Sequence, residues 1–175
     1  MSKLRTPVTD KDDQTGNLKG KAVLVEYGDY QCPHCGHAFP LVKKLLQEMG
    51  EDLHFVFRNF PLSEVHPLAY DAALVAEAAG RQGKFWEMHD MIFKRQITMT
   101  EDSFAQYVST LKLDPKRMQA DIADQAIIAK VEDDFESGVK SGVNGTPTFF
   151  LNGERLNSYD GSYESLKEAV EAAIT

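Results

Sequence analysis

Two cysteines, Cys32 and Cys35, stand two residues apart around Pro33 and His34, and the 175-residue chain contains no others. This spacing places the sulfurs about one helical turn apart, so they can close a small disulfide ring and open it again. Pro33 suits the first turn of a helix, because its missing N–H would have no partner there. We therefore expect a reactive cysteine pair at the start of a helix.

The start of a helix favours a thiolate. Unpaired backbone N–H groups and the positive end of the helix dipole stabilise the anion and lower the pKa of the thiol. Cys32, first in the turn, is expected to be the exposed nucleophile, and Cys35 the shielded resolving thiol. The imidazole of His34 is expected to favour the thiolate further, and a stabilised reduced form makes the pair a stronger oxidant.

Two other uses of the same spacing are less favoured. A structural zinc site needs four converging ligands, and the histidines nearby are His34, inside the ring, and His37, on nearly the opposite side of the helix. An inert structural disulfide would close so short a loop that it would add little stability. We expect no metal and no cofactor at the cysteine pair.

Local patterns place the pair between a strand and a helix. Residues 22–27 form an apolar run rich in β-branched and aromatic residues, typical of a buried strand. Beyond Cys35, apolar residues recur on one helical face as far as Gly50, which ends the helix. Residues 53–60 predict the next strand. Strand, helix and strand in this order predict a βαβ unit with parallel strands, and hence an α/β fold.

The second half of the chain changes pattern. Residues 65–140 carry helical periodicity without a convincing strand, and Asp114-Pro115 is a typical helix start. Residues 148–156 predict a hairpin around the turn Asn152-Gly153. Residues 165–174 predict a closing helix. A helical stretch of this length indicates a subdomain inserted between two halves of a sheet.

The N-terminal residues are polar and lack apolar periodicity, which indicates an irregular segment. The predicted organisation has three parts: a polar N-terminal segment over residues 1–20, a core over residues 21–64 and 141–175, and a helical insertion over residues 65–140.

Composition and charge exclude several classes of partner. Asp and Glu number 27 against 19 Lys and Arg, and the net charge of −8 opposes binding to nucleic acid or anionic lipid. No apolar run approaches the roughly 18 residues of a membrane span. Residues 1–13 lack the apolar stretch of a secretory signal, so the chain as written is expected in the cytosol. A mature fragment of a periplasmic protein would look the same, and that alternative stays open.

Several segments together resemble the DsbA-like branch of thioredoxin-fold proteins, whose active-site tetrapeptide is also Cys-Pro-His-Cys. They follow one another in the family's order: Val25–Gly36, Arg58–Leu62, His66-Pro67, Gly83–His89 and Gly142–Gly153. The resemblance covers most of residues 22–174. It implies a thioredoxin fold interrupted by an inserted helical domain, and thiol–disulfide oxidoreductase activity.

The resemblance also assigns roles outside the cysteine pair. Thr146-Pro147 matches the family's cis-proline loop, which packs against the active-site disulfide and would present Thr146 backbone groups to an extended peptide. A strand-opening trans proline is the alternative. Glu26 matches a buried acid beneath the resolving sulfur, where a raised pKa would let it exchange a proton with Cys35. Alternatively, Glu26 faces water. Mainly structural roles are expected for His37, His54, His66, His89 and Trp86.

Three functional hypotheses follow. The first is a dithiol oxidase that accepts electrons from protein or peptide thiols and is reoxidised by an unidentified redox partner. The second is a disulfide reductase or isomerase, which would suit a cytosolic location. The third is a binding module that holds unfolded peptide, with redox chemistry incidental. Neither nucleic acid nor a membrane span belongs to any of them.

Overall fold

The computed structural model describes residues 2–175, so Met1, the first residue of the polar N-terminal segment, lies outside the described residues. Five strands form one sheet in the order β1-β3-β2-β4-β5. β2 and β3 run parallel, and every other neighbouring pair is antiparallel. The strands are β1 (Asp13–Gly16), β2 (Ala22–Gly28), β3 (Leu53–Asn59), β4 (Thr148–Leu151) and β5 (Glu154–Arg155).

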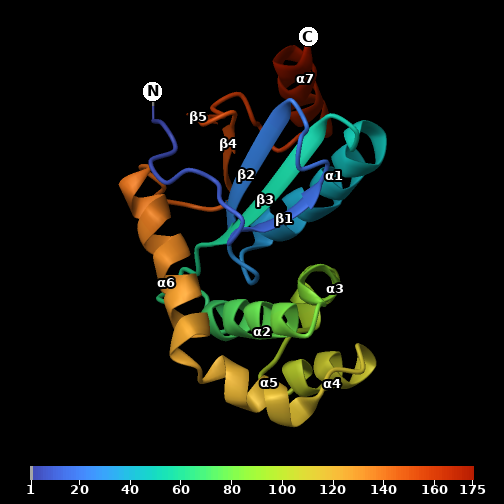
Figure 1. Ribbon diagram of the computed structural model, residues 1–175, viewed down its shortest axis with the longest axis vertical. Coiled ribbons are helices and arrows are strands. Elements are labelled where there is room, and N and C mark those ends of the chain that lie inside the picture. Colours follow the sequence, from blue (N-terminus) through green and yellow to red (C-terminus); the bar gives the residue numbers. More distant parts are fainter. Residues whose placement is uncertain (1) are drawn as a thin grey trace.

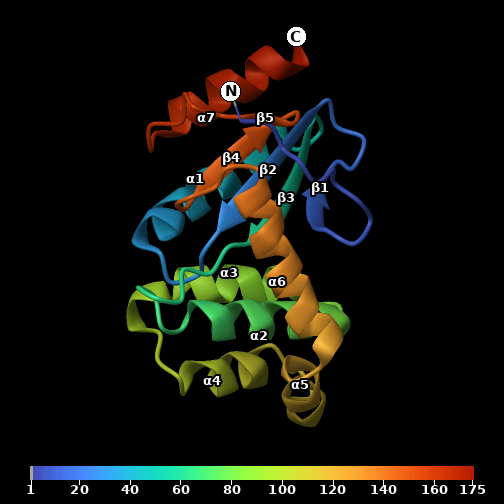
Figure 2. The same ribbon diagram turned by 90° about the vertical axis from the view of Figure 1, so that its left-hand side faces the viewer.

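The helices fall into two groups. α1 (Pro33–Met49) joins the two parallel strands, and α7 (Tyr163–Ile174) closes the chain. Between β3 and β4 lie α2 (Ala69–Arg81), α3 (Phe85–Lys94), the short 3-10 helix η1 (Gln96–Thr98), α4 (Ser103–Thr110), α5 (Pro115–Ile122) and α6 (Gln125–Lys140). Figure 1 shows α2 to α5 gathered at the end of the molecule away from α7, and Figure 2 shows α6 extending from this group alongside the sheet.

The fold therefore confirms the expected α/β class with helices inserted between parts of a sheet. The hairpin is also confirmed: Asn152 and Gly153 both have positive φ, 50° and 85°, as a tight two-residue turn requires. Asp114 caps α5 by accepting the N–H groups of Lys116 and Arg117. The exact limits of the three predicted parts stay a prediction. None of the helices in residues 2–175 is long and apolar enough to cross a membrane.

Alternation along β2 decides what lies beneath the start of α1. Leu24 belongs to the core that includes Val42 and Leu45 of α1, whereas Val25 belongs to a separate core with Phe150 on the other face of the sheet. Successive side chains of a strand point to opposite faces, so Glu26 lies on the same face as Leu24. The strand thus directs this carboxyl group toward α1.

The N-terminal segment is not irregular throughout, which corrects that expectation. Asp13–Gly16 form β1 and pair with β3 at the edge of the sheet. Arg58 of β3, whose side chain is 2% exposed, donates to both carboxylate oxygens of Asp12, at 2.8 and 3.0 Å. The segment is ordered by backbone hydrogen bonds to β3 and by a buried ion pair. These interactions do not require apolar residues, so the sequence shows no apolar periodicity here.

Candidate active site

The cysteine pair lies at the start of α1, a few residues after the end of β2. Cys32 is the N-cap residue of α1 and Pro33 is its first helical residue, as predicted from their spacing. Both cysteines are free thiols. Cys35 is fully buried, as expected. Cys32 is only 4% exposed, which corrects the expectation of an exposed nucleophile. The sulfur of Cys32 lies 3.6 Å from the carbonyl oxygen of Thr146, so the loop before β4 covers it.

The local hydrogen bonds favour a thiolate at Cys32. Its pKa falls from 9.0 to about 5, chiefly through a hydrogen bond from the Cys35 thiol. The nearby Thr146 and the backbone N–H groups of Cys35 and His34 lower the pKa further, and together they outweigh the opposing effect of burial. His34 lowers the pKa of Cys32 through its backbone N–H, and the effect of its imidazole stays a prediction. At neutral pH Cys32 is therefore largely an anion.

Cys35 behaves in the opposite way. Burial raises its pKa well above the ordinary value, and the neighbouring Cys32 and Glu26 raise it further. The backbone N–H of Asp29 points at its sulfur, 3.4 Å away. A protonated thiol beside a thiolate is the arrangement in which Cys35 can donate to Cys32.

Glu26 is buried on β2, with 3% of its surface exposed, and does not face water. Burial, followed by the charge of Cys32, raises its pKa to about 8. Glu26 also lines a small cavity of about 60 Å³, whose wall includes Lys43 and Asp90. These two residues form a partly exposed ion pair at 2.7 Å. The cavity therefore extends from the buried acid to charged groups that reach solvent.

The residues Thr146 and Pro147 form the cover of the pair. The peptide bond between them is cis, the geometry that the resemblance implies. The side-chain oxygen of Thr146 is buried and has no hydrogen-bond partner within residues 2–175. Its hydroxyl is thus available to the Cys32 thiolate, in agreement with its effect on the pKa of that thiol.

Asp29 is a site residue that the sequence analysis missed. It is 1% exposed, and one carboxylate oxygen accepts the N–H groups of Gln31 and Cys32, at 2.7 and 3.1 Å. The other oxygen accepts the N–H of Leu62 at 2.9 Å and bonds Nδ1 of His66 at 2.8 Å. An Asp three residues before Cys32 is a typical turn-forming signal and could have indicated the first pair of bonds. The bonds to Leu62 and His66 join segments distant in sequence.

The histidines outside the pair make structural contacts. His89 is buried among aromatic rings and bonds the Tyr30 hydroxyl at 2.9 Å, and burial lowers its pKa to about 3. His37 bonds the carbonyl oxygen of Gly161 at 2.7 Å, and His54 bonds Gln14 at the same distance. In the part of the chain from residue 2 onward, no group of three or more His, Cys, Asp or Glu side chains is arranged to hold a metal ion.

Comparisons with known proteins agree with this geometry. The model of a protein family described as Thioredoxin matches residues 9–172. Among solved structures, the chain is similar to a thioredoxin-like oxidoreductase from Silicibacter pomeroyi DSS-3, with 25% identity, a TM-score of 0.82 and coverage of 94% of this chain and 93% of that one. BdbD from Bacillus subtilis, in its oxidised form, shares the fold at 21% identity, with a TM-score of 0.84 and coverage of 99% and 98%.

A curated relative is much longer than this chain. The Na(+)/H(+) antiporter NhaA 1 of Salinispora arenicola is 41% identical over 173 residues, which are 98% of this chain and 26% of the relative. The chain thus spans about a quarter of the length of this relative.

Proposed function

Because this chain belongs to the thioredoxin family, we propose that it is a thiol–disulfide oxidoreductase that oxidises dithiols in proteins or peptides. The observation that carries the proposal is the position of the Cys32 thiol at the N-cap of α1, beside the buried Cys35 thiol. This setting lowers the pKa of Cys32 to about 5, which makes its thiolate stable at neutral pH. A stable thiolate is a good leaving group, and it favours the reduced enzyme over the disulfide. Electrons then flow from the substrate to the enzyme.

The proposed reaction has two exchange steps. A substrate thiolate attacks the Cys32 sulfur of the Cys32–Cys35 disulfide, which forms a mixed disulfide and releases the Cys35 sulfur. A second substrate thiol then loses its proton to solvent and attacks the substrate sulfur, releasing Cys32 as a thiolate. The substrate dithiol gives up two electrons and becomes a disulfide, and the enzyme leaves as a dithiol. A redox partner that accepts those electrons completes the cycle.

We propose that Glu26 donates the proton that the released Cys35 sulfur takes up. The Cys35 sulfur must be protonated when the ring opens, because its own pKa is raised by burial. With a pKa of about 8, the Glu26 carboxyl group holds a proton at neutral pH and can give it up there. The cavity beside it has room for water, through which the proton can be replaced from solvent. Thr146 and Pro147 are assigned to substrate binding over Cys32.

An oxidising couple is useful where disulfides persist. We therefore propose that the domain works outside the cytosol, which is the alternative location and not the one expected from the N-terminal residues. A reductase or isomerase would instead suit a reducing compartment.

Equilibration with glutathione separates the oxidase from the reductase. We expect the Cys32/Cys35 couple to have a potential between about −200 and about −120 mV, the range of oxidising thiol proteins. A potential near about −270 mV, typical of a reducing thioredoxin, would instead assign the protein to the reductase class. The fractions of oxidised and reduced protein are measured by thiol alkylation after an acid quench.

A further inference from the structure

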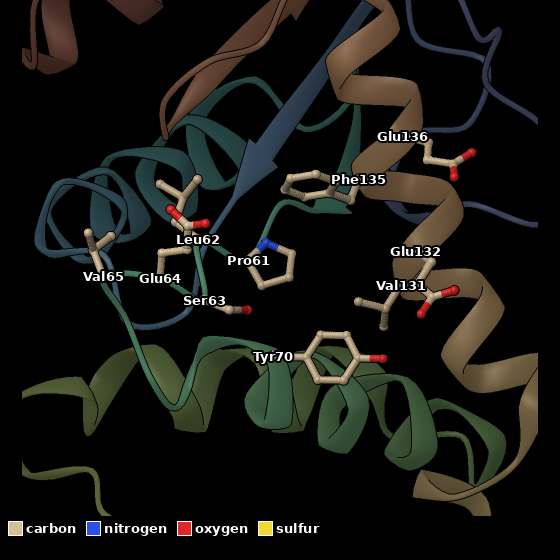
Figure 3. Close-up of a pocket in the computed structure, with 10 residues that line it drawn as sticks. All are labelled: Pro61, Leu62, Ser63, Glu64, Val65, Tyr70, Val131, Glu132, Phe135 and Glu136. Carbon is tan, nitrogen blue, oxygen red and sulfur yellow. The ribbon is translucent and has the colours of Figure 1, made fainter.

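A groove lies between the loop that follows β3 and two of the inserted helices. Its volume is about 640 Å³, and its walls are the loop after β3, the first turn of α2 and one face of α6. Figure 3 shows Val131 and Phe135 pointing from α6 toward Pro61, with Tyr70 below them on α2. The apolar residues that line it are Pro61, Leu62, Val65, Tyr70, Val131 and Phe135.

The groove leaves apolar surface open to water. Val65 in the wall of the groove is 68% exposed. A recessed, mostly apolar surface of this kind is typical of sites that bind a partner. The groove has the size and shape for several side chains of a polypeptide.

The charge of the lining restricts which polypeptide fits. Its charged residues are Glu64, Glu132 and Glu136, and among the described residues 2–175 no Lys, Arg or His lines the groove. Glu132 and Glu136 are one turn apart on α6, where like charges destabilise a helix unless a cation lies between them. We call this surface the acidic groove. Its chemistry suits apolar side chains with Lys or Arg beside them.

One wall of the acidic groove is joined to the cysteine pair by hydrogen bonds, and the other wall is linked to it only through the course of the chain. Asp29 binds the N–H of Leu62 in one wall and the N–H of Cys32 through the same carboxylate group. From the other wall, α6 leads after Lys140 into the segment that carries Thr146, whose carbonyl oxygen lies against the Cys32 sulfur. A chain held at Cys32 by a mixed disulfide can therefore continue into the acidic groove.

We propose that the acidic groove binds the substrate polypeptide beside its reacting cysteine, and that it selects segments in which an apolar residue is flanked by Lys or Arg. This inference rests on the proposed function and adds its substrate class. It requires no chemistry beyond the exchange at Cys32.

Two dithiol peptides test the selection. They share one sequence with a leucine beside the cysteines, and one carries Lys where the other carries Glu. At low salt we expect the oxidised protein to oxidise the Lys peptide at least about 10-fold faster, with less difference at high salt. In Glu132→Gln/Glu136→Gln protein the ratio should fall below about 3-fold. The Glu164→Gln/Glu168→Gln protein is a matched control, because these exposed residues of α7 have the same spacing and lie away from the groove.

The outcomes distinguish this inference from the proposed function. If the wild-type protein oxidises dithiothreitol but treats both peptides alike, or if both double variants reduce the ratio equally, the acidic groove does not select substrate. If dithiothreitol is not oxidised, the proposed function itself fails. Sedimentation of the wild-type protein adds a further test, because a dimer lost only in the groove variant would assign the groove to a second copy of the chain and overturn the inference.

Discussion

Replacing Cys32 with serine is expected to abolish dithiol oxidation, with a loss of roughly 10³-fold or more. A hydroxyl group at this position cannot form the disulfide that accepts the electrons, and no other cysteine is present besides Cys35. The measurement is the rate at which a reduced dithiol peptide becomes oxidised in the presence of an oxidant such as glutathione disulfide.

The matching Cys35→Ser variant separates the roles of the two sulfurs. It retains the Cys32 thiolate but has no thiol to resolve an adduct, so incubation with a disulfide peptide should accumulate a mixed disulfide at Cys32. Mass spectrometry of the intact and digested protein locates the adduct. Two results for the Cys32→Ser variant would show that the roles of nucleophile and resolving thiol are wrongly assigned. One is retained activity, and the other is an adduct on Cys35 that turns over normally.

Glu26→Gln is expected to slow exchange at Cys35 while making the folded protein more stable at alkaline pH. Glutamine cannot supply the proton that the released Cys35 sulfur needs, so the rate of ring opening should fall by about 10²-fold at neutral pH. Stopped-flow oxidation of dithiothreitol measures this rate. Equal rates for wild-type and Glu26→Gln protein would remove Glu26 from the proton transfer.

The effect on stability has a defined pH range. Burial, followed by the charge of Cys32, raises the pKa of Glu26 from 4.5 to about 8, so the folded state binds this proton more tightly than the unfolded state. The wild-type protein therefore loses stability as the pH rises from about 4.5 to about 8, and a neutral glutamine does not. The free energy of unfolding of Glu26→Gln protein, relative to that of the wild type, is expected to be about 2 to 4 kcal/mol higher at pH 8 than at pH 4.

Urea denaturation at both pH values measures this change. The comparison is made in a Cys32→Ser background, so that the thiolate does not titrate in the same range. In this background burial alone raises the pKa of Glu26, so the lower end of the expected change applies. A difference between wild-type and Glu26→Gln protein that does not vary with pH would mean that the carboxyl group is not held in a desolvated position.

The parts of the molecule that follow from short segments could be predicted from the sequence. The apolar run before Cys32, Pro33 at the first helical position and the Asn152-Gly153 turn each specify local structure by backbone preference and alternation. The burial of Glu26 required the resemblance to a family, because alternation alone permits either face of a strand.

The features that depend on distant contacts could not be predicted in this way. β1 is polar, and its order comes from pairing with β3 and from the Asp12–Arg58 ion pair. Asp29 binds Leu62 and His66 across more than thirty residues, and the acidic groove forms only when the loop after β3 meets α6. The low exposure of Cys32 has the same origin, because the covering loop lies more than a hundred residues away in sequence.

The proposed oxidase function depends most on the anionic state of Cys32 in the reduced protein. The ultraviolet absorbance of the thiolate, followed as a function of pH, measures it directly, and alanine at Cys35 removes the hydrogen bond that contributes most. We expect a midpoint at about pH 5 in the wild-type protein and a shift toward the ordinary value of 9.0 in Cys35→Ala. A wild-type midpoint close to 9.0 would rule out the oxidase function, because the reduced form would then have no advantage over the disulfide.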